Sequence, residues 1–382
     1  MFKKNKVLCA MSGGVDSSVA AALLKKDGYN VIGVFMKFWS EPSAAQNSDD
    51  AFSDAKKVAD ILDIPLYTVD FKKEFKKKVV DNFLKEYSLG KTPNPCVRCN
   101  KFIKFGLLFD EMNRYGAEYA ASGHYARLSK KQENNKTIKQ GAEYEVGEGG
   151  IRLLKAKDKN KDQSYFLYNL TQDKLKKLLF PVGGYTKLEA RELAKKFKLP
   201  VHGRKESQEV CFTGGMDNYD FLRRHLKAVK GDIITVDGKK VGEHNGLPFY
   251  TIGQRRGIKI GGTGPYYVVE LDFKNNRLIV ASGAKHPTLM RDFLICKNVN
   301  WVSGQIPNLP LKCKARIRYG QREAEAQVFS APQSSKERLR RSGVGEKYLV
   351  KFKTPQFAIT AGQSVVFYKG DEVLGGGVIE NF

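Results

Sequence analysis

The chain has 382 residues, with 66 Lys and Arg against 41 Asp and Glu, so its formal net charge is +25. Hydrophobic residues make up 41% of it and aromatic residues 11%, which excludes a largely disordered chain and leaves material for two or three domains. The basic excess indicates a polyanionic partner, such as a nucleic acid or an acidic membrane surface.

The basic charge is spread along the whole chain. It amounts to +14 over residues 1–207, +4 over residues 208–285 and +7 over residues 286–382. Such a spread favours a large folded ligand over binding through one basic arm. No run approaches the roughly 20 apolar residues of a membrane span. The start of the chain does not resemble a signal peptide, and the six cysteines are too few for a secreted disulfide scaffold. We therefore expect a cytoplasmic protein with no membrane partner.

Strands and helices alternate over the first half of the chain. Short apolar runs predict strands at residues 6–11, 31–36, 66–70 and 118–126. Helical spacing predicts helices at residues 19–28, 49–61, 72–87, 100–115 and 185–199. In the last of these, Thr186 and Glu189 have the spacing of a capping box, and Pro200 ends the helix. This alternation predicts a parallel sheet wrapped by helices.

The pattern changes after residue 207. Short alternating runs separated by Gly- and Asn-rich turns predict β-structure, and the last block of the chain resembles a small barrel. We therefore expect three domains, at 1–207, 208–285 and 286–382. The polar stretch 129–150 is expected to be a surface insertion, and the run 336–341 adds to the basic field.

The sharpest local motif is the sequence SGGVDSS at residues 12–18, between a predicted strand and a predicted helix. Its two glycines allow a tight turn and close approach to a ligand, and the helix that follows offers free N–H groups to an anion. The Gly-Lys-Ser/Thr ending of a Walker loop is absent. Because Asp16 would repel phosphate, we expect Mg²⁺ beside it. The alternative is a Gly-rich turn without a ligand.

Three of the six cysteines lie in polar motifs. Cys99 precedes a helix predicted to begin at Asn100 and is flanked by Arg98 and Lys101, an arrangement that favours a nucleophilic thiolate. Cys96 and Cys211 are the other two, and with Cys99 they would also suit a metal site, as ligands of zinc or of an iron–sulfur cluster. A fourth thiolate is not evident in the sequence. A four-coordinate structural zinc site is therefore disfavoured, while an iron–sulfur cluster remains an alternative. The other cysteines, Cys9, Cys296 and Cys313, are expected in the core.

The motif at residues 12–18 resembles the SGGxDS loop of the PP-loop ATP pyrophosphatase superfamily. Over nearly the whole chain, the sequence resembles the bacterial tRNA-specific 2-thiouridylases. The resemblance is carried by the motifs AMSGGVDSSVAA, GVFMKFW, TPNPCVRCNKFIKFG, ASGHYAR, KDQSYFLY, KESQEVCF, YTIGQRRGI, ARIRY and AITAGQ. It implies an α/β + β fold: a parallel-sheet PP-loop catalytic domain, a small central β-rich domain and a C-terminal β-barrel.

The resemblance also implies roles for individual residues. Cys99 would be the nucleophile, and Cys211 would carry a persulfide. ATP would be bound by Ala10, Met11, Ser12, Gly13, Gly14, Val15, Asp16, Ser17, Ser18, Met36 and Gly123. The target base would be bordered by Asn94, Pro95 and Cys96. The tRNA would be contacted by His124, Lys161, Asp162, Gln163, Arg318, Tyr319 and Gln363.

The implied reaction is the ATP-dependent 2-thiolation of the wobble uridine of tRNA, in which Mg·ATP adenylates the C2 oxygen. A sulfur-relay protein would hand a persulfide to Cys211, and the target base would leave its stack in the anticodon loop of a tRNA bound by a monomeric enzyme. Some relatives have NPD where this chain has NPC at Cys96, so a cluster on Cys96, Cys99 and Cys211 remains an alternative to the persulfide route. Two other classes stay open: a different PP-loop ligase, and a metal-holding RNA-binding protein without activity.

Overall fold

The structure is a computed structural model that describes residues 5–42, 45–130, 150–204, 210–258, 260–261, 264–331 and 346–380. Two segments singled out above lie outside these residues: 131–149, most of the expected insertion, and the basic run 336–341. Among the helices in the described ranges, none is long and apolar enough to cross a membrane.

The N-terminal part is built on a five-stranded sheet in the order β3-β2-β1-β4-β7. All neighbouring strands are parallel, as the alternating pattern predicted. The strands are β1 (Lys6–Ala10), β2 (Asn30–Lys37), β3 (Leu66–Asp70), β4 (Tyr119–Ala121) and β7 (Leu178–Leu179). Three helices pack against this sheet or against one another: α1 (Val15–Lys26) and α2 (Ala45–Ile61) contact strands, and α8 (Lys187–Lys196) contacts α1. The predicted capping box of Thr186 and Glu189 is present at the start of α8.

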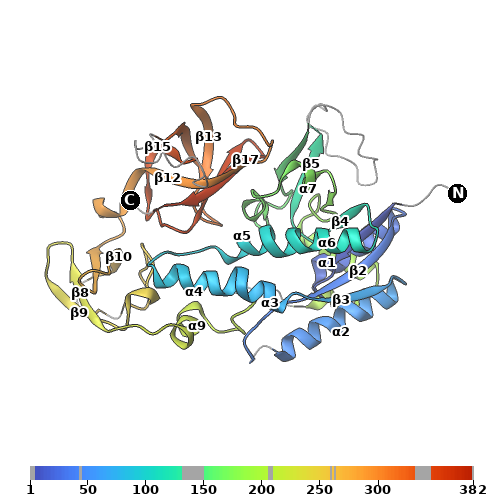
Figure 1. Ribbon diagram of the computed structural model, residues 1–382, viewed down its shortest axis with the longest axis horizontal. Coiled ribbons are helices and arrows are strands. Elements are labelled where there is room, and N and C mark those ends of the chain that lie inside the picture. The colour runs from blue at the N-terminus through green and yellow to red at the C-terminus, as the bar shows by residue number, and fades with distance from the viewer. Residues whose placement is uncertain are drawn as a thin grey trace.

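Two helical rods run beside this sheet (Figure 1). The first consists of α3 (Lys72–Phe75), the π-helical turn η2 (Lys76–Val80) and α4 (Asp81–Ser88). The second consists of α5 (Pro95–Cys99), the π-helix η3 (Asn100–Leu107) and α6 (Leu108–Arg114). The second rod carries Cys96 and Cys99, so it fixes where two of the predicted thiols lie.

The middle of the chain forms a separate four-stranded sheet in the order β10-β11-β8-β9. Its strands are β8 (Gly231–Thr235), β9 (Lys240–His244), β10 (Tyr266–Asp272) and β11 (Arg277–Ser282). The helix α9 (Asn218–His225) precedes it. In Figure 1 this sheet lies at the opposite end of the molecule from α2.

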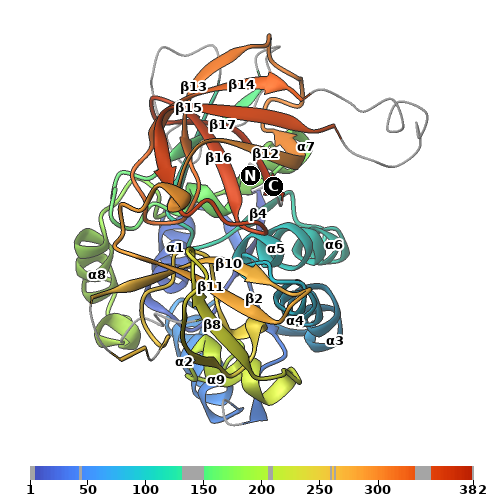
Figure 2. The ribbon, with the colours of Figure 1, turned by 90° about the vertical axis from the view of Figure 1, so that its left-hand side faces the viewer.

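The C-terminal part is a closed six-stranded barrel, seen above the other parts in Figure 2. Its strands run in the order β12-β15-β14-β13-β16-β17, and pairing of β12 with β17 closes the ring. They are β12 (Met290–Trp301), β13 (Leu311–Arg316), β14 (Ala324–Ser330), β15 (Tyr348–Phe357), β16 (Ser364–Lys369) and β17 (Glu372–Ile379). A hairpin of β5 (Ala126–Lys130) and β6 (Ile151–Lys155) joins this sheet at β17. The predicted fold class is therefore confirmed.

One hydrophobic core joins the helical rods to the later parts of the chain. Phe212 is 1% exposed and packs its ring against three others, with centroid distances of 5.9 Å to Phe75, 5.3 Å to Phe83 and 5.3 Å to Phe221. Cys99 belongs to the same buried cluster. Because Cys211 is the residue before Phe212, this aromatic cluster anchors its segment of chain to the rods.

We predict that Phe212→Ala lowers stability by about 3–5 kcal/mol, since it removes a fully buried ring and leaves a cavity. The midpoint of urea denaturation measures the loss. Phe273→Ala is the matched control, because the Phe273 side chain is 45% exposed and its removal should cost about 0.5 kcal/mol or less. Equal midpoints for the two variants would contradict the anchoring role of Phe212.

Candidate active site

The turn between β1 and α1 leaves backbone N–H groups open at the start of a helix. Gly14 is the N-cap of α1 and, lacking a side chain, supplies no capping hydrogen bond. Gly13 has a positive φ of 73°, and a Cβ there would lie 2.1 Å from the carbonyl oxygen of Ala51. Only glycine fits this position without a shift of backbone. The uncapped first turn of α1 can therefore accept an anion such as a phosphate.

The serine hydroxyls of this loop shape the turn itself. Ser17 and Ser18 both donate to the carbonyl oxygen of Gly14, over 3.1 Å and 2.9 Å, and the Ser12 backbone N–H donates to the Ser17 hydroxyl over 3.1 Å. Ser12 alone of the three serines is exposed. The side chains of Ala10, Met11 and Val15 are buried, so these residues present backbone to the turn.

Asp16 is held by two side chains that sequence reasoning did not single out. The Lys187 ammonium donates to both carboxylate oxygens, over 2.7 Å and 2.8 Å, and the Tyr125 hydroxyl donates to Oδ1 over 2.8 Å. Lys187 is the first residue of α8, far along the chain, and no local pattern marks it. A positive charge therefore already lies beside this carboxylate, in the Lys187 ammonium.

Gly123, from the ASGHY motif, packs its backbone onto the start of α1. A Cβ at Gly123 would lie 2.6 Å from both the Asp16 carbonyl carbon and the Ser17 nitrogen. The other residue expected at the nucleotide, Met36, is half-buried in β2 and packs against the core. The structure therefore brings Gly123 against the loop at residues 12–18, as a shared nucleotide site requires.

We predict that Gly123→Ala displaces the first turn of α1, because backbone cannot move aside as a flexible side chain can. Such overpacking costs about 1–3 kcal/mol. The melting temperature and the affinity for ATP should both fall. Gly184→Ala is the control, since a Cβ at Gly184 meets nothing within 4 Å. If both variants bind ATP like the unaltered protein, the packing of Gly123 does not shape the loop.

The helix that carries the cysteines begins earlier than predicted. Asn94 is its N-cap and accepts from the Val97 N–H over 3.2 Å, and Pro95 occupies the first turn. The predicted start at Asn100 is wrong. An Asn followed by Pro is a helix-start signal that could have located this end. Cys96 therefore lies in the first turn, while Cys99 lies at the end of α5, inside a continuous helical rod.

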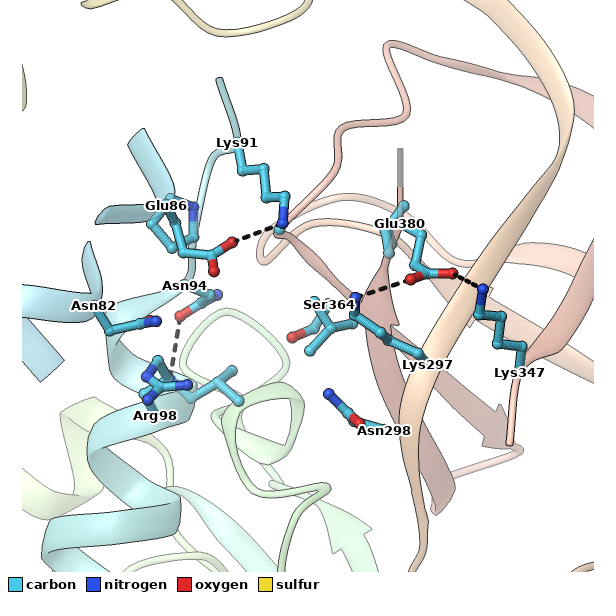
Figure 3. A pocket seen from close by; sticks show the side chains of 15 residues that line it. Asn82, Glu86, Lys91, Asn94, Arg98, Lys297, Asn298, Lys347, Ser364 and Glu380 are labelled. Carbon is cyan, nitrogen blue, oxygen red and sulfur yellow. Dashed lines mark hydrogen bonds and ion pairs between the residues drawn. The ribbon is translucent and has the colours of Figure 1, made fainter. Parts of the chain in front are cut away.

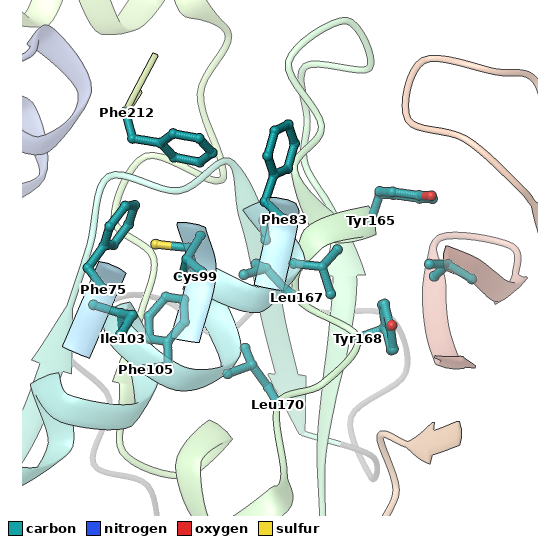
Figure 4. Close-up of a cluster of buried hydrophobic side chains, with 14 of the residues drawn as sticks. Phe75, Phe83, Cys99, Ile103, Phe105, Tyr165, Leu167, Tyr168, Leu170 and Phe212 are labelled. Atoms are coloured by element: carbon teal, nitrogen blue, oxygen red, sulfur yellow. The ribbon is translucent and has the colours of Figure 1, made fainter. Parts of the chain in front are cut away.

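Cys99 is enclosed by apolar side chains. It is 6% exposed and belongs to a cluster that includes Phe75, Ile103 and Phe105 (Figure 4). Arg98 and Lys101, expected to favour its thiolate, instead stack on Phe102, with centroid distances of 5.0 Å and 5.4 Å. The Arg98 guanidinium also donates to the Lys78 carbonyl oxygen over 2.9 Å. These two cations therefore contact Phe102 and the Lys78 backbone rather than the Cys99 sulfur.

The thiols of Cys96, Cys99 and Cys211 are close enough that their charges affect one another, and the charge of Lys104 affects all three. We call these four residues the thiol site.

Burial is the largest cause that raises the pKa of the Cys99 thiol to about 12. The charge of Lys104 opposes this rise, and negative charge on Cys211 or Cys96 adds to it. Cys96 and Cys211 are exposed, unlike Cys99. Desolvation by the atoms around it still raises the pKa of Cys211 to about 11, with Cys96 adding and Lys104 opposing. Desolvation also raises the pKa of Cys96, again opposed by Lys104. Burial of Cys99 thus opposes the thiolate that the sequence pattern favoured there.

A pH dependence follows from these shifts. Because the pKa of Cys99 is raised to about 12, its thiolate fraction should grow about tenfold per pH unit from pH 7 to pH 10. Alkylation of Cys99 by iodoacetamide, followed by peptide mass spectrometry, should rise in the same proportion without a plateau. A plateau near pH 8 would instead show an ordinary or lowered pKa.

Residues expected at the tRNA from the catalytic part are largely engaged within the protein. His124 is buried, its Nδ1 lies 2.7 Å from the Ser122 hydroxyl, and burial together with Lys104 lowers its pKa well below the ordinary value. Gln163 exchanges two hydrogen bonds with the backbone of Tyr125, both of 2.9 Å. Asp162 is 4% exposed and accepts from the Ser164 hydroxyl over 3.0 Å. Lys161, beside it, is half-buried.

Residues expected at the tRNA from the barrel tie the parts of the chain together. The Arg318 guanidinium donates to the carbonyl oxygens of Ile252 and Ala358, over 3.1 Å and 2.8 Å. The Gln363 amide donates to the Thr92 carbonyl oxygen over 2.8 Å, just before the Asn94 cap. Tyr319 is 45% exposed, and its pKa is raised first by burial and next by the charge of Asp162, with Cys96 adding the smallest effect. The barrel thus contacts the loop that leads into the cysteine-bearing helix.

A pocket of about 420 Å³ lies between α4, α5 and the barrel (Figure 3). Its carboxylates are paired: Glu86 with Lys91 at 3.6 Å, and Glu380 with Lys297 at 2.8 Å. Asn94 lines it, but the three thiols do not. The pocket therefore lies against the thiol-bearing helix and outside the thiol site.

Comparisons with known proteins agree with this geometry. Residues 5–215 match the family described as tRNA methyl transferase HUP domain, residues 219–282 the tRNA methyl transferase PRC-barrel domain, and residues 291–379 the aminomethyltransferase beta-barrel domain. The chain is 44% identical to the tRNA-specific 2-thiouridylase MnmA of Coxiella burnetii, over 99% of both chains. The chain belongs to the tRNA-specific 2-thiouridylase family. It is 43% identical to the MnmA of Nitrosomonas europaea, again over 99% of both chains.

Family membership makes the chain a sulfur-transferring, tRNA-modifying enzyme, which excludes the binding protein without activity. Solved structures match only in part. The U34-tRNA thiolase NcsA from Methanococcus maripaludis, solved with its 4Fe-4S cluster, aligns with a TM-score of 0.35 and 20% identity, over 55% of this chain and 62% of that one. A 4-thiouridine synthetase–RNA complex with bound ATP gives a TM-score of 0.34, 17% identity, and 55% and 45% coverage. Matches this partial carry no argument about the thiol site.

An iron–sulfur cluster on Cys96, Cys99 and Cys211 is not supported. Within the described ranges, no three His, Cys, Asp or Glu side chains come together closely enough to hold a metal. The thiols are near enough to influence one another's charge but are not arranged as ligands.

Proposed function

We propose that the protein thiolates C2 of the wobble uridine of tRNA, using ATP to adenylate the C2 oxygen and a persulfide on Cys211 as the sulfur source. The observation that carries this proposal is the common neighbourhood of Cys99 and Cys211, two thiols far apart in sequence. Sulfur transfer through a persulfide and a disulfide needs two such thiols. The family supports the same reaction class.

Activation of the base belongs to the loop at residues 12–18. Its open N–H groups at the start of α1 would hold the ATP phosphates, and Gly123 keeps the neighbouring backbone close. Magnesium supplies charge neutralisation to the phosphates when it is bound, and Asp16 is the nearest carboxylate of the loop. Lys187 pairs with that carboxylate in this structure. We infer that, when Mg·ATP binds, the Lys187 ammonium turns to the phosphates and the Asp16 carboxylate becomes free to bind the ion.

Sulfur transfer belongs to the thiol site. A sulfur-relay protein delivers sulfur to Cys211, which becomes a persulfide. The Cys99 thiolate attacks the inner sulfur, the persulfide S–S bond breaks, and hydrosulfide leaves as a Cys99–Cys211 disulfide forms. Hydrosulfide adds at the adenylated C2, AMP departs, and a thiol reductant then restores both thiols. In the direct variant, the outer persulfide sulfur attacks the adenylated C2 and AMP departs. The Cys99 thiolate then attacks the Cys211 sulfur, so that the linkage breaks, the outer sulfur stays on C2 and the Cys99–Cys211 disulfide forms.

The target base enters beside Asn94, Pro95 and Cys96. A base can reach the thiol site only after leaving its stack, and single-stranded loops permit this. Tyr319 offers an exposed aromatic face at this entrance. The net charge of +25 suits an RNA that spans the catalytic part, the central sheet and the barrel.

The test is a reconstitution with purified full-length protein, unmodified tRNA, Mg·ATP and a persulfide donor, with nucleosides measured by mass spectrometry. We expect 2-thiouridine and AMP in equal amounts. Cys211→Ser should lower thiolation at least about 100-fold, because the sulfur-carrying thiol is lost. Cys313→Ser is the matched control, since Cys313 lies in the barrel strand β13 and should keep its activity.

Two outcomes would count against the proposal. If the protein binds ATP but forms no 2-thiouridine, it does not catalyse this reaction. If Cys211→Ser thiolates from the persulfide donor at the unaltered rate, the persulfide role of Cys211 is wrong. The iron–sulfur cluster is tested separately by a visible absorption spectrum after anaerobic purification. If the protein is colourless and free of iron but fully active, the reaction does not require a cluster.

A further inference from the structure

Lys104 is the cationic member of the thiol site. It is half-buried on η3, and in the described part of the chain it forms no ion pair with a carboxylate. The neighbouring cations differ, because Arg98 and Lys101 stack on Phe102. A half-buried ammonium without a carboxylate is available to an anion that enters or forms beside it.

The π-helix places Lys104 on the side of the helix that carries Cys99. In an α-helix, residue i+5 lies well round the cylinder from residue i, because a turn takes 3.6 residues. Hydrogen bonds from i+5 to i bring the two residues to the same side, and η3 begins directly after Cys99. The backbone of Lys104 also acts on Cys99 and lowers its pKa, against the larger effect of burial.

The charge of Lys104 acts on every member of the thiol site. It opposes the rise in pKa at Cys96, Cys99 and Cys211, which come from two separate segments. It also helps to keep His124 neutral, after the effect of burial. Lys104 thus lies among these groups, and with His124 neutral it is the cation common to all three thiols.

A second polar group of interest lies on the same helix. Asn100 is 5% exposed, and its Oδ1 accepts no hydrogen bond in the described structure. It lies four residues before Lys104, a spacing that brings two helical side chains within reach of each other. A buried acceptor beside an unpaired ammonium can hold that ammonium when the lysine side chain turns inward.

We propose that Lys104 supplies the positive charge that stabilises anionic sulfur at the thiol site. This inference deepens the proposed function and rests on it. Before transfer the charge stabilises the Cys99 thiolate, formed when the thiol loses its proton to solvent. When Cys99 attacks the persulfide of Cys211, the negative charge passes to the departing hydrosulfide, and the same ammonium stabilises it there.

The test measures thiol reactivity in the full-length protein without tRNA. Lys104→Met, Lys104→Arg and Lys101→Met are alkylated with neutral iodoacetamide and with anionic iodoacetate, and each cysteine is followed by peptide mass spectrometry. Lys104→Met should slow the reaction of Cys99 and Cys211 with iodoacetamide about tenfold at a given pH, equivalent to a pKa higher by about one unit. The iodoacetate rate should fall further, because the local positive charge is gone.

Lys104→Arg keeps the charge and should restore both rates, and Lys101→Met should leave them unchanged because Lys101 stacks on Phe102. The ratio of the iodoacetate rate to the iodoacetamide rate separates the effect of charge from the effect of access. A merely structural role of Lys104 would change both rates by the same factor. The inference is overturned if Lys104→Met keeps the unaltered ratio, or if Lys104→Arg behaves like Lys104→Met. Lys104→Gln gives the same reading if the methionine variant does not fold.

Single-turnover thiolation separates this inference from the proposed function. We expect Lys104→Met to slow 2-thiouridine formation at least tenfold while ATP binding is kept. If the unaltered protein makes no 2-thiouridine, the proposed function fails, yet the reagent ratio still decides whether Lys104 provides the charge. If thiolation proceeds at the unaltered rate in Lys104→Met, the inference fails and the proposed function stands.

Discussion

Burial of the cysteine-bearing helix in a shared core is the constraint on which the rest of the site depends. Cys99 lies among apolar side chains of the two helical rods, and Phe212 anchors the Cys211 segment to the same aromatic cluster. The packing that buries Cys99 also removes water from its thiol and so raises its pKa, whereas Cys96 and Cys211 are exposed. For Cys99, proximity to the other thiols and a low thiolate content are therefore two results of one packing arrangement.

A site of this kind needs positive charge where negative charge develops. The structure provides it twice, at Lys187 beside the loop at residues 12–18 and at Lys104 beside the thiols. The two reactions proposed here place negative charge at the same two positions, on phosphate during adenylation and on sulfur during transfer. Lys187 is already paired with Asp16, whereas Lys104 is not paired with a carboxylate in the described residues. From this difference we infer that Lys187 shapes the loop and that Lys104 is the cation for anionic sulfur.

The contacts between the parts of the chain involve residues that the family resemblance connects with tRNA. Arg318 holds backbone carbonyls of the central segment and the barrel, and Gln363 holds the loop before the cysteine-bearing helix. Residues with such internal bonds can meet RNA only through their remaining donors or after a rearrangement. Changes at Arg318 or Gln363 would therefore alter the position of the barrel as well as any RNA contact.

Local sequence determined the elements whose causes are local. The glycines of the loop at residues 12–18, the Thr186–Glu189 capping box and the alternation of strands and helices were all readable, because each depends on neighbours a few residues apart. Only the tertiary structure decided the burial of Cys99, the pairing of Asp16 with Lys187 and the approach of Cys211 to Lys104 and the other two thiols. These features depend on desolvation and on charges brought together from distant segments, so spacing along the chain does not encode them.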